Sequence, residues 1–210
     1  MTLTYLIIGI TCITSYLAFQ NPRLMQKLLY HPHSVKNQGE YYRLITHGLV
    51  HNNWWHLGVN MYVLYVFGRT VELTFVTHYN ILGIYIFLAL YFLGMLVAAL
   101  PAWLRHQDNS YYRSVGASGA VAAVLFTYII FYPFSMLQFV FVPFFDFPAI
   151  LFGVGYLLYE TYADKKANDF IAHDAHIFGA LFGVTFPIIL NYNYGLNFIN
   201  EVLTYFLQFI

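Results

Sequence analysis

A serine among small residues is the first candidate for chemistry in this chain. Ser118 lies in the segment SVGASGA (114–120), directly before a long apolar run. A serine hydroxyl becomes a useful nucleophile when a base removes its proton, and histidine titrates in the range that this requires. His176, in a second apolar segment, is the candidate base. Such a pair predicts acyl transfer.

Acyl transfer also requires hydrogen-bond donors for the negative charge that develops on the carbonyl oxygen. His56 and Asn60 are four residues apart, so both side chains lie on one face of a helix. The backbone N–H groups at the start of the helix predicted from Gly116 have no partners within that helix. We therefore assign His56, Asn60 and Gly116 to an oxyanion and substrate-binding site.

The composition places these residues in a membrane. The chain is 60% hydrophobic and 9% charged, with a net charge of zero, which is far from the balance of a soluble protein. Four long stretches carry no Asp, Glu, Lys or Arg, and a membrane span needs about 20 apolar residues. The single cysteine, Cys12, excludes an intramolecular disulfide and a cysteine-rich metal site. No basic patch indicates a nucleic-acid partner, and the lipid bilayer is the expected surrounding.

Charges and helix breakers predict an all-α, polytopic bundle of six transmembrane helices in one domain, residues 1–210. The expected helices are residues 3–19, 54–75, 81–104, 116–132, 149–162 and 170–190, followed by an interfacial helix at 197–210. The second, fourth and sixth helices then start from the same side of the membrane. His56, Asn60, Ser118 and His176 therefore share one layer, about 3–10 Å along their helices from one face.

Small residues predict a close approach of the fourth and sixth helices. Gly179 and Gly183 lie on the same helical face as His176, and Gly119 follows Ser118. Small faces allow helix backbones to approach closely in a bilayer, which would close the Ser–His pair. Asp174 points elsewhere on its helix, so we expect a dyad and no acidic third member.

These residues resemble the rhomboid intramembrane serine proteases over nearly the whole chain. The resemblance is carried by GASG at 116–119, HNNWWHLGVN at 51–60 and AHDAHIFGALFG at 172–183. It implies a Ser118 nucleophile, a His176 base, and His56 with Asn60 at the oxyanion site. It also implies transmembrane protein substrates, no metal or organic cofactor, a site open to the non-cytoplasmic side, and a fifth helix that acts with its preceding loop as the substrate gate.

The resemblance also implies structural roles for Arg43 and Glu72. The chain departs from the family at a position that would support the catalytic histidine. The family often has an aromatic residue four positions after the serine, packed on the catalytic histidine, whereas this chain has Ala122. For the gate we expect bulky residues of the fifth helix near the active-site face, among them Phe147, Ile150 and Leu151.

Two other interpretations remain open, and so does the orientation. A histidine-rich metalloenzyme would use His47 with His51, or His173 with His176, although no carboxylate accompanies either pair in the sequence. A catalytically inactive relative would bind membrane clients. Lys and Arg residues gather on the side of the site, which indicates a cytoplasmic face, whereas the resemblance implies the opposite. We expect the plasma membrane of a prokaryote.

Overall fold

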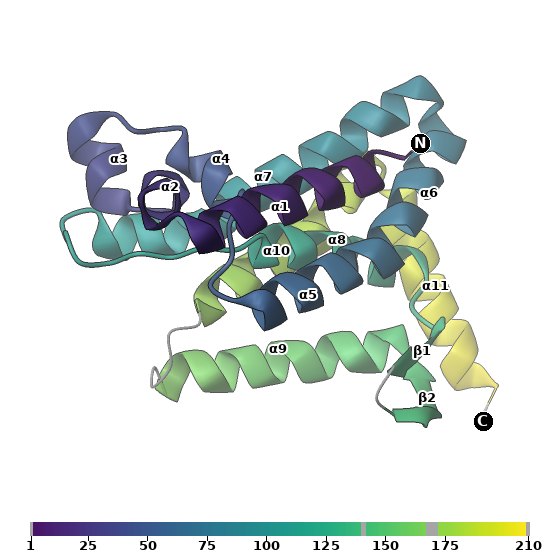
Figure 1. Cartoon of the computed structure of the whole chain (residues 1–210). Coiled ribbons are helices and arrows are strands. Elements are labelled where there is room, and N and C mark those ends of the chain that lie inside the picture. The colour runs from purple at the N-terminus through teal and green to yellow at the C-terminus, as the bar shows by residue number, and fades with distance from the viewer. Residues whose placement is uncertain (1, 140–141, 167–171, 209–210) are drawn as a thin grey trace.

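The computed structural model describes residues 2–139, 142–166 and 172–208. Within these ranges the chain is helical except for loops and one β-hairpin (Figure 1). The long helices are α1 (Leu3–Gln20), α5 (Trp54–Val63) continued by a π-helical turn (Leu64–Gly68) and α6 (Arg69–Tyr79), α7 (Ile81–His106), α8 (Ser118–Phe131), α9 (Ala149–Lys166), α10 (His173–Leu190) and α11 (Asn193–Leu207).

The chain is an all-α polytopic membrane protein, as its composition predicts. Helices α1, α7 and α10 are each long and apolar enough to cross a membrane. Helix α8 is apolar over its 14 residues but shorter. The number of spans, six, stays a prediction.

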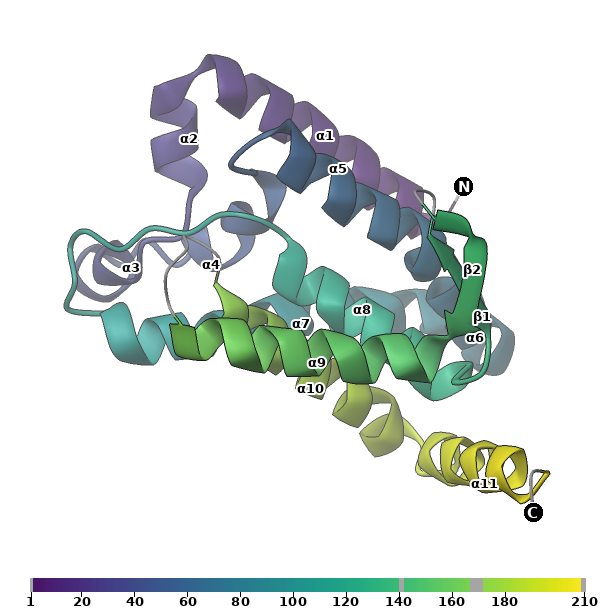
Figure 2. The same ribbon diagram turned by 90° about the horizontal axis from the view of Figure 1, so that it is seen from below.

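Helix α8 lies at the centre of the bundle, between α5, α7, α9 and α10 (Figure 2). Every residue from Gly119 to Thr127 is buried, because Gly and Ala leave room for neighbouring helices on several sides. The one polar side chain in this run, Thr127, donates its hydroxyl to the carbonyl oxygen of Gly183 at 2.8 Å. A polar group in an apolar bundle is thus satisfied by the partner helix.

Helices α8 and α10 touch backbone to backbone. A Cβ atom added to Gly179 would overlap the carbonyl oxygen of Gly119, and one added to Gly183 would overlap that of Ala123. The predicted close approach of these helices is therefore present. It fixes α10 against the first two turns of α8, where Ser118 lies.

The connection from α1 to α5 folds into short helices and packs against the loop that precedes Ser118. These are α2 (Pro22–Leu28), α3 (Pro32–Gln38), α4 (Arg43–Thr46) and a 3₁₀ turn (His47–Leu49). Arg43 is nearly buried and donates to the carbonyl oxygens of Gln26 and Leu29, both at 2.8 Å, and to Glu40 at 2.6 Å. The predicted structural role of Arg43 is thereby confirmed.

Glu72 has the structural role that was expected of it. This buried carboxylate of α6 accepts hydrogen bonds from the backbone N–H groups of Leu3 and Thr4 and from the Thr4 hydroxyl, at 2.8, 2.9 and 2.7 Å. The first N–H groups of a helix have no intrahelical partners. A side chain from α6 therefore caps α1.

Several predicted boundaries differ from the structure. The fourth helix begins at Ser118 and not at 116, because Gly116 has a φ of +116°, which does not fit a right-handed helix. Helix α9 reaches Lys166, past the predicted end at 162, and α11 begins at Asn193 instead of 197. The sixth helix begins at His173; the predicted start at residue 170 lies outside the described residues.

Residues 136–139 and 142–148, expected only as part of a break between helices, form the antiparallel strands β1 (Met136–Phe139) and β2 (Val142–Pro148) of a hairpin. The strands are antiparallel, with Met136 opposite Pro148 and Leu137 opposite Phe147. Pro148 ends the second strand, at the sheet edge where a residue without an N–H group is tolerated. The fold is still built from helices, and the hairpin only joins α8 to α9.

The hairpin lies at the far end of α8 from Ser118, which corrects the predicted gate. The start of α9 is bonded to the segment after α8, through Ala149 to Ser135 and Ile150 to Pro133, both at 2.9 Å. Fourteen helical residues separate this end from Ser118 by about 20 Å. The expectation that Phe147, Ile150 and Leu151 lie near the active-site face was wrong, because α9 ends at that face and does not begin there.

Candidate active site

Backbone hydrogen bonds hold the loop that carries Ser118 to the start of α8. Tyr30 and Ser114 exchange two of them, at 2.9 and 3.1 Å. The Gly116 N–H donates to the carbonyl oxygen of His47 at 3.0 Å. Ser118 then begins α8, and the N–H groups of its first turn have no partners within that helix. They are the backbone donors nearest to a substrate carbonyl attacked by Ser118.

His51 fixes the residue directly before the serine. Its Nε2 accepts the N–H of Ala117 at 3.4 Å, and its Nδ1 lies 3.0 Å from the hydroxyl oxygen of Ser15, which in turn donates to the Leu49 carbonyl oxygen at 2.9 Å. This pattern requires a neutral ring with the proton on Nδ1. Burial lowers the pKa of His51 to about 3 and that of His47 to about 4. Both rings therefore serve as neutral structural groups.

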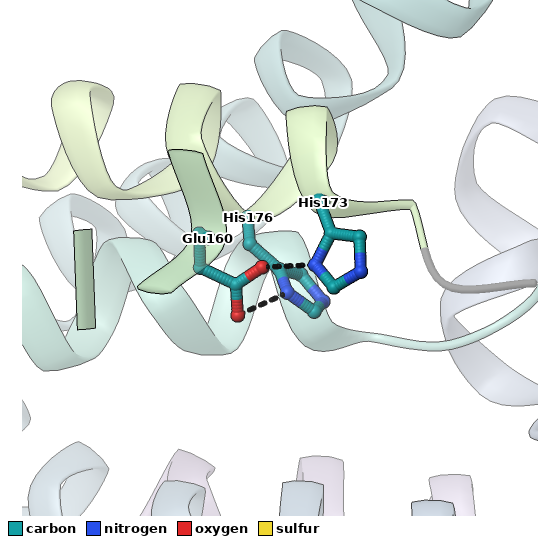
Figure 3. Close-up of side chains that lie close together, drawn as sticks. All are labelled: Glu160, His173 and His176. Atoms are coloured by element: carbon teal, nitrogen blue, oxygen red, sulfur yellow. Dashed lines mark hydrogen bonds and ion pairs between the residues drawn. The ribbon is translucent and has the colours of Figure 1, made fainter. Parts of the chain in front are cut away.

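His176 is held by an acidic residue that the sequence did not predict. Its Nδ1 lies 3.0 Å from one carboxylate oxygen of Glu160, and the Nδ1 of His173 lies 2.6 Å from the other (Figure 3). Glu160 and His173 are buried. In the described part of the chain, Nε2 of His176 has no such partner and remains available as the base. The expectation that no Asp or Glu supports His176 was wrong.

The direction of α9 explains how Glu160 reaches the histidine. The space beside Gly153 is filled by Ile129, and the ring of Tyr156 lies 5.7 Å from that of Phe126. As the chain advances along α9 it therefore passes back along α8 toward Ser118, which brings Glu160 level with the first turns of α10. The sequence did contain a signal, because an ionisable residue within an apolar helix is a functional candidate by default.

Tyr156 supplies the aromatic partner that position 122 lacks. Its ring lies 6.3 Å from the ring of His176 at an interplanar angle of 35°. Tyr156 and Glu160 are four residues apart and so lie on one face of α9. Ala122 is buried within α8 and leaves room on that helix. The histidine is therefore packed and oriented from α9 and not from the helix of the serine.

Ser118 and His176 lie on helices that touch at this level. The position of a Cβ on Gly119, next to Ser118, is 3.3 Å from the carbonyl oxygen of Ala175, the residue before His176. Among the described residues, the Ser118 hydroxyl forms no hydrogen bond with His176. Catalytic hydrogen bonds of enzymes without substrate are often long and tighten in the substrate complex. The catalytic pairing of the two residues stays a prediction.

His56 and Gly116 meet at the loop that precedes Ser118, and Asn60 lies one turn along α5 from His56. Gly116 packs directly against His56, since a Cβ there would lie 2.6 Å from the imidazole Cε1. Asn60 is buried, and its amide nitrogen donates to the carbonyl oxygen of His56 at 2.9 Å. His56 thus lies at the loop of the serine, whereas the amide of Asn60 is bonded within its own helix. Their assignment to the oxyanion site is a prediction.

A small cavity lies behind the serine. Its volume is about 30 Å³, and Tyr30, His47, Ser114 and Ser118 line it together with apolar side chains. A water molecule needs roughly 10–15 Å³ of such space and several polar partners. The cavity therefore has the size and the polar groups for a water molecule next to Ser118.

The two histidine pairs considered for a metal have different surroundings. His47 directs Nδ1 to the carbonyl oxygen of Arg43 at 2.8 Å, and both nitrogens of His51 have partners. His173 and His176 instead converge on Glu160, with their ligand atoms and the carboxylate within 4.8 Å of one another. The expectation that no carboxylate accompanies His173 and His176 was therefore wrong.

Comparison with known proteins identifies a family and several relatives. The rhomboid domain family matches residues 38–193. The mitochondrial presenilin-associated rhomboid-like proteins of Homo sapiens and Bos taurus are each 30% identical over 135 residues, covering 64% of this chain and 34% of theirs. The chloroplastic rhomboid-like protein 11 of Arabidopsis thaliana is 31% identical over 184 residues, covering 82% of this chain and 59% of its own.

These matches limit what carries over from the relatives. The matched part spans about a third of the length of the mitochondrial proteins. Their names place them in mitochondria and chloroplasts, which lends no support to the expected prokaryotic plasma membrane. The match to the family itself covers most of this chain, including Ser118, His176, Glu160, His56, Asn60 and Gly116. The chain is a multi-pass membrane protein that belongs to the rhomboid family.

Proposed function

We propose that this protein is an intramembrane serine endopeptidase that cleaves transmembrane or membrane-proximal segments of other membrane proteins. Ser118 is the nucleophile and His176 the base, with Glu160 as the group that orients the base. The observation that carries the proposal is the orientation of the His176 ring. Its Nδ1 is held by Glu160, which leaves Nε2 for a serine on the touching helix.

The chemistry follows from these positions. Nε2 of His176 takes the proton of the Ser118 hydroxyl as its oxygen attacks the scissile carbonyl, and then gives that proton to the leaving amine. First-turn N–H groups of α8, with His56 and Asn60, stabilise the oxyanion. Water from the side of the small cavity hydrolyses the acyl-enzyme. The carboxylate of Glu160 fixes the tautomer and stabilises the imidazolium, as the acidic member of a triad does.

The partners follow from the setting. The substrates are transmembrane proteins that reach the site from the bilayer, and this chemistry needs no metal or organic cofactor and involves no nucleic acid. The aromatic ring of Tyr156 supports the histidine in place of the family aromatic residue, which favours an active enzyme over a client-binding relative.

The test is proteolysis of a model transmembrane substrate by purified protein in liposomes. Wild-type protein should cleave it, whereas Ser118→Ala, His176→Ala and the double variant should be equally inactive, because members of one catalytic unit are not additive. A fluorophosphonate probe should label the wild type and not Ser118→Ala. Cleavage by Ser118→Ala at more than a small fraction of the wild-type rate would refute the proposal. Substrate binding without cleavage by the wild type would support the client-binding interpretation.

A further inference from the structure

The cluster of Glu160, His173 and His176 has more polar groups than a serine protease site uses. One carboxylate oxygen suffices to orient His176, yet the second is bonded to His173 at 2.6 Å. The two imidazole rings are 6.2 Å apart and nearly perpendicular, at 85°. Each Nδ1 lies near a different oxygen of the same carboxylate, so the two rings and the carboxylate meet between α9 and α10 (Figure 3).

Two histidines and one carboxylate form a donor set typical of divalent transition metals. Zinc is commonly bound by two His and one Glu with a fourth position open to water. His173 and His176 are three residues apart, so a helix presents them on one face, and Glu160 completes the set from the neighbouring helix. The ligand atoms all lie within 4.8 Å of one another. Tetrahedral bonds of 2.0–2.1 Å place such atoms about 3.3 Å apart, so shifts of about 1 Å would suffice.

The environment of the cluster also fits a bound cation. The side chains of His173 and Glu160 are 3% and 6% exposed, and that of His176 is 14% exposed. Burial limits competition from bulk water, and a carboxylate between two imidazoles is favourable when a cation shares the space. Arg105 pairs with Asp174, the residue after His173, at 3.2 Å.

We propose that Glu160, His173 and His176 form an inhibitory binding site for a divalent transition metal of the zinc class. Metal on Nδ1 of His176 leaves the ring proton on Nε2, which is the nitrogen that must accept the proton of Ser118. The bound ring cannot act as the base while it holds that proton. The same metal joins α9 to α10 and so stabilises the protein. The loss of activity rests on the proposed protease function, whereas the metal binding does not.

The experiment measures binding first, on the full-length Ser118→Ala protein in detergent, which keeps all three ligands. Titration with Co²⁺ should produce the visible absorption of four-coordinate cobalt, and Zn²⁺ should abolish that absorption at a stoichiometry of one. His173→Gln and Glu160→Gln in the same background should weaken binding by about a hundredfold or more. His106→Gln, a histidine outside the cluster, is the matched control and should bind as the parent does.

A second measurement uses the protein with Ser118 intact. Zn²⁺ should inhibit cleavage by the wild type, and a chelator should restore it. His173→Gln should keep measurable cleavage without metal, and Zn²⁺ should not lower that rate. Zn²⁺ should also raise the melting temperature of the Ser118→Ala protein, which tests the site even if His173→Gln does not fold.

The outcomes separate the two proposals. Saturable binding that is lost in both ligand variants supports the metal site even if no substrate is cleaved. Equal binding by the parent and both ligand variants, or no four-coordinate cobalt spectrum, overturns it. Inhibition by Zn²⁺ that persists unchanged in His173→Gln also overturns it, because the metal would then act elsewhere.

Discussion

The contact between α8 and α10 yields the sharpest prediction, which is the effect of Gly179→Ala. A Cβ on Gly179 would lie 2.9 Å from the carbonyl carbon of Gly119 and would overlap its oxygen, whereas ordinary contacts begin at 3.4 Å. The atoms in the way belong to backbone, so no side chain can rotate aside. The two helices must separate by about 1 Å, one turn from His176. A misplacement of about 1 Å in a catalytic site costs on the order of 10² in rate.

The assay is the cleavage rate of a transmembrane substrate in liposomes, together with thermal unfolding in detergent. Gly183→Ala meets the backbone of Ala123 equally closely but lies about 10 Å along α10 from His176. It should destabilise the protein to a similar extent and slow cleavage less. Gly155→Ala is the matched control, because nothing lies within 4 Å of its added Cβ, and it should keep the wild-type rate. A Gly179→Ala variant that cleaves at half the wild-type rate or faster would refute the reasoning.

Three further predictions concern single groups. Tyr156→Ala should lower the cleavage rate by about tenfold or more, because it removes the ring packed on His176, whereas Tyr156→Phe should keep most of the rate; equal rates for both would contradict this role. Glu72→Ala should lower the free energy of unfolding by about 3 kcal/mol, measured by denaturation in detergent, because it leaves three donors of α1 without acceptors. Burial holds the pKa of His47 at about 4 and of His51 at about 3, below the ordinary 6.5, so the unfolded chain takes up protons first as the pH falls. The free energy of unfolding should therefore be highest above pH 6.5 and fall by about 2 kcal/mol for each histidine by pH 5; melting temperatures that do not change between pH 7 and 5 would contradict this.

The sequence predicted features that depend on local pattern. Charge-free stretches placed the long helices, and the small residues around Gly119 and Gly179 predicted which helices touch, because both signals are carried by neighbouring positions. The start of the fourth helix was predicted two residues early, since the positive φ of Gly116 is a property of its packing against His56. That packing is not visible in the sequence.

The support of His176 was missed for a different reason. Glu160 is 16 residues away in sequence and belongs to another helix, so its approach depends on the rotation of α9 about its own axis. The turn of one helix on another is set by side-chain packing, here that of Phe126 and Ile129 of α8 against α9. The apolar pattern of α9 gives no clear single face, because most of its residues are apolar. The position of a residue along its helix could therefore be predicted from the sequence, but the neighbouring helix that its side chain faces could not.

Hydrogen bonds between α1 and later segments of the chain indicate where the folded domain begins. The family match starts at residue 38, which leaves α1 outside. Yet Glu72 accepts hydrogen bonds from Leu3 and Thr4 of α1. His51, which accepts the N–H of the residue before Ser118, is hydrogen-bonded to Ser15 of α1. A protein cut at the limits of sequence similarity would contain a buried carboxylate and a buried imidazole whose partners had been removed. The range matched by the family is thus smaller than the part of the chain that these hydrogen bonds hold together, which includes α1.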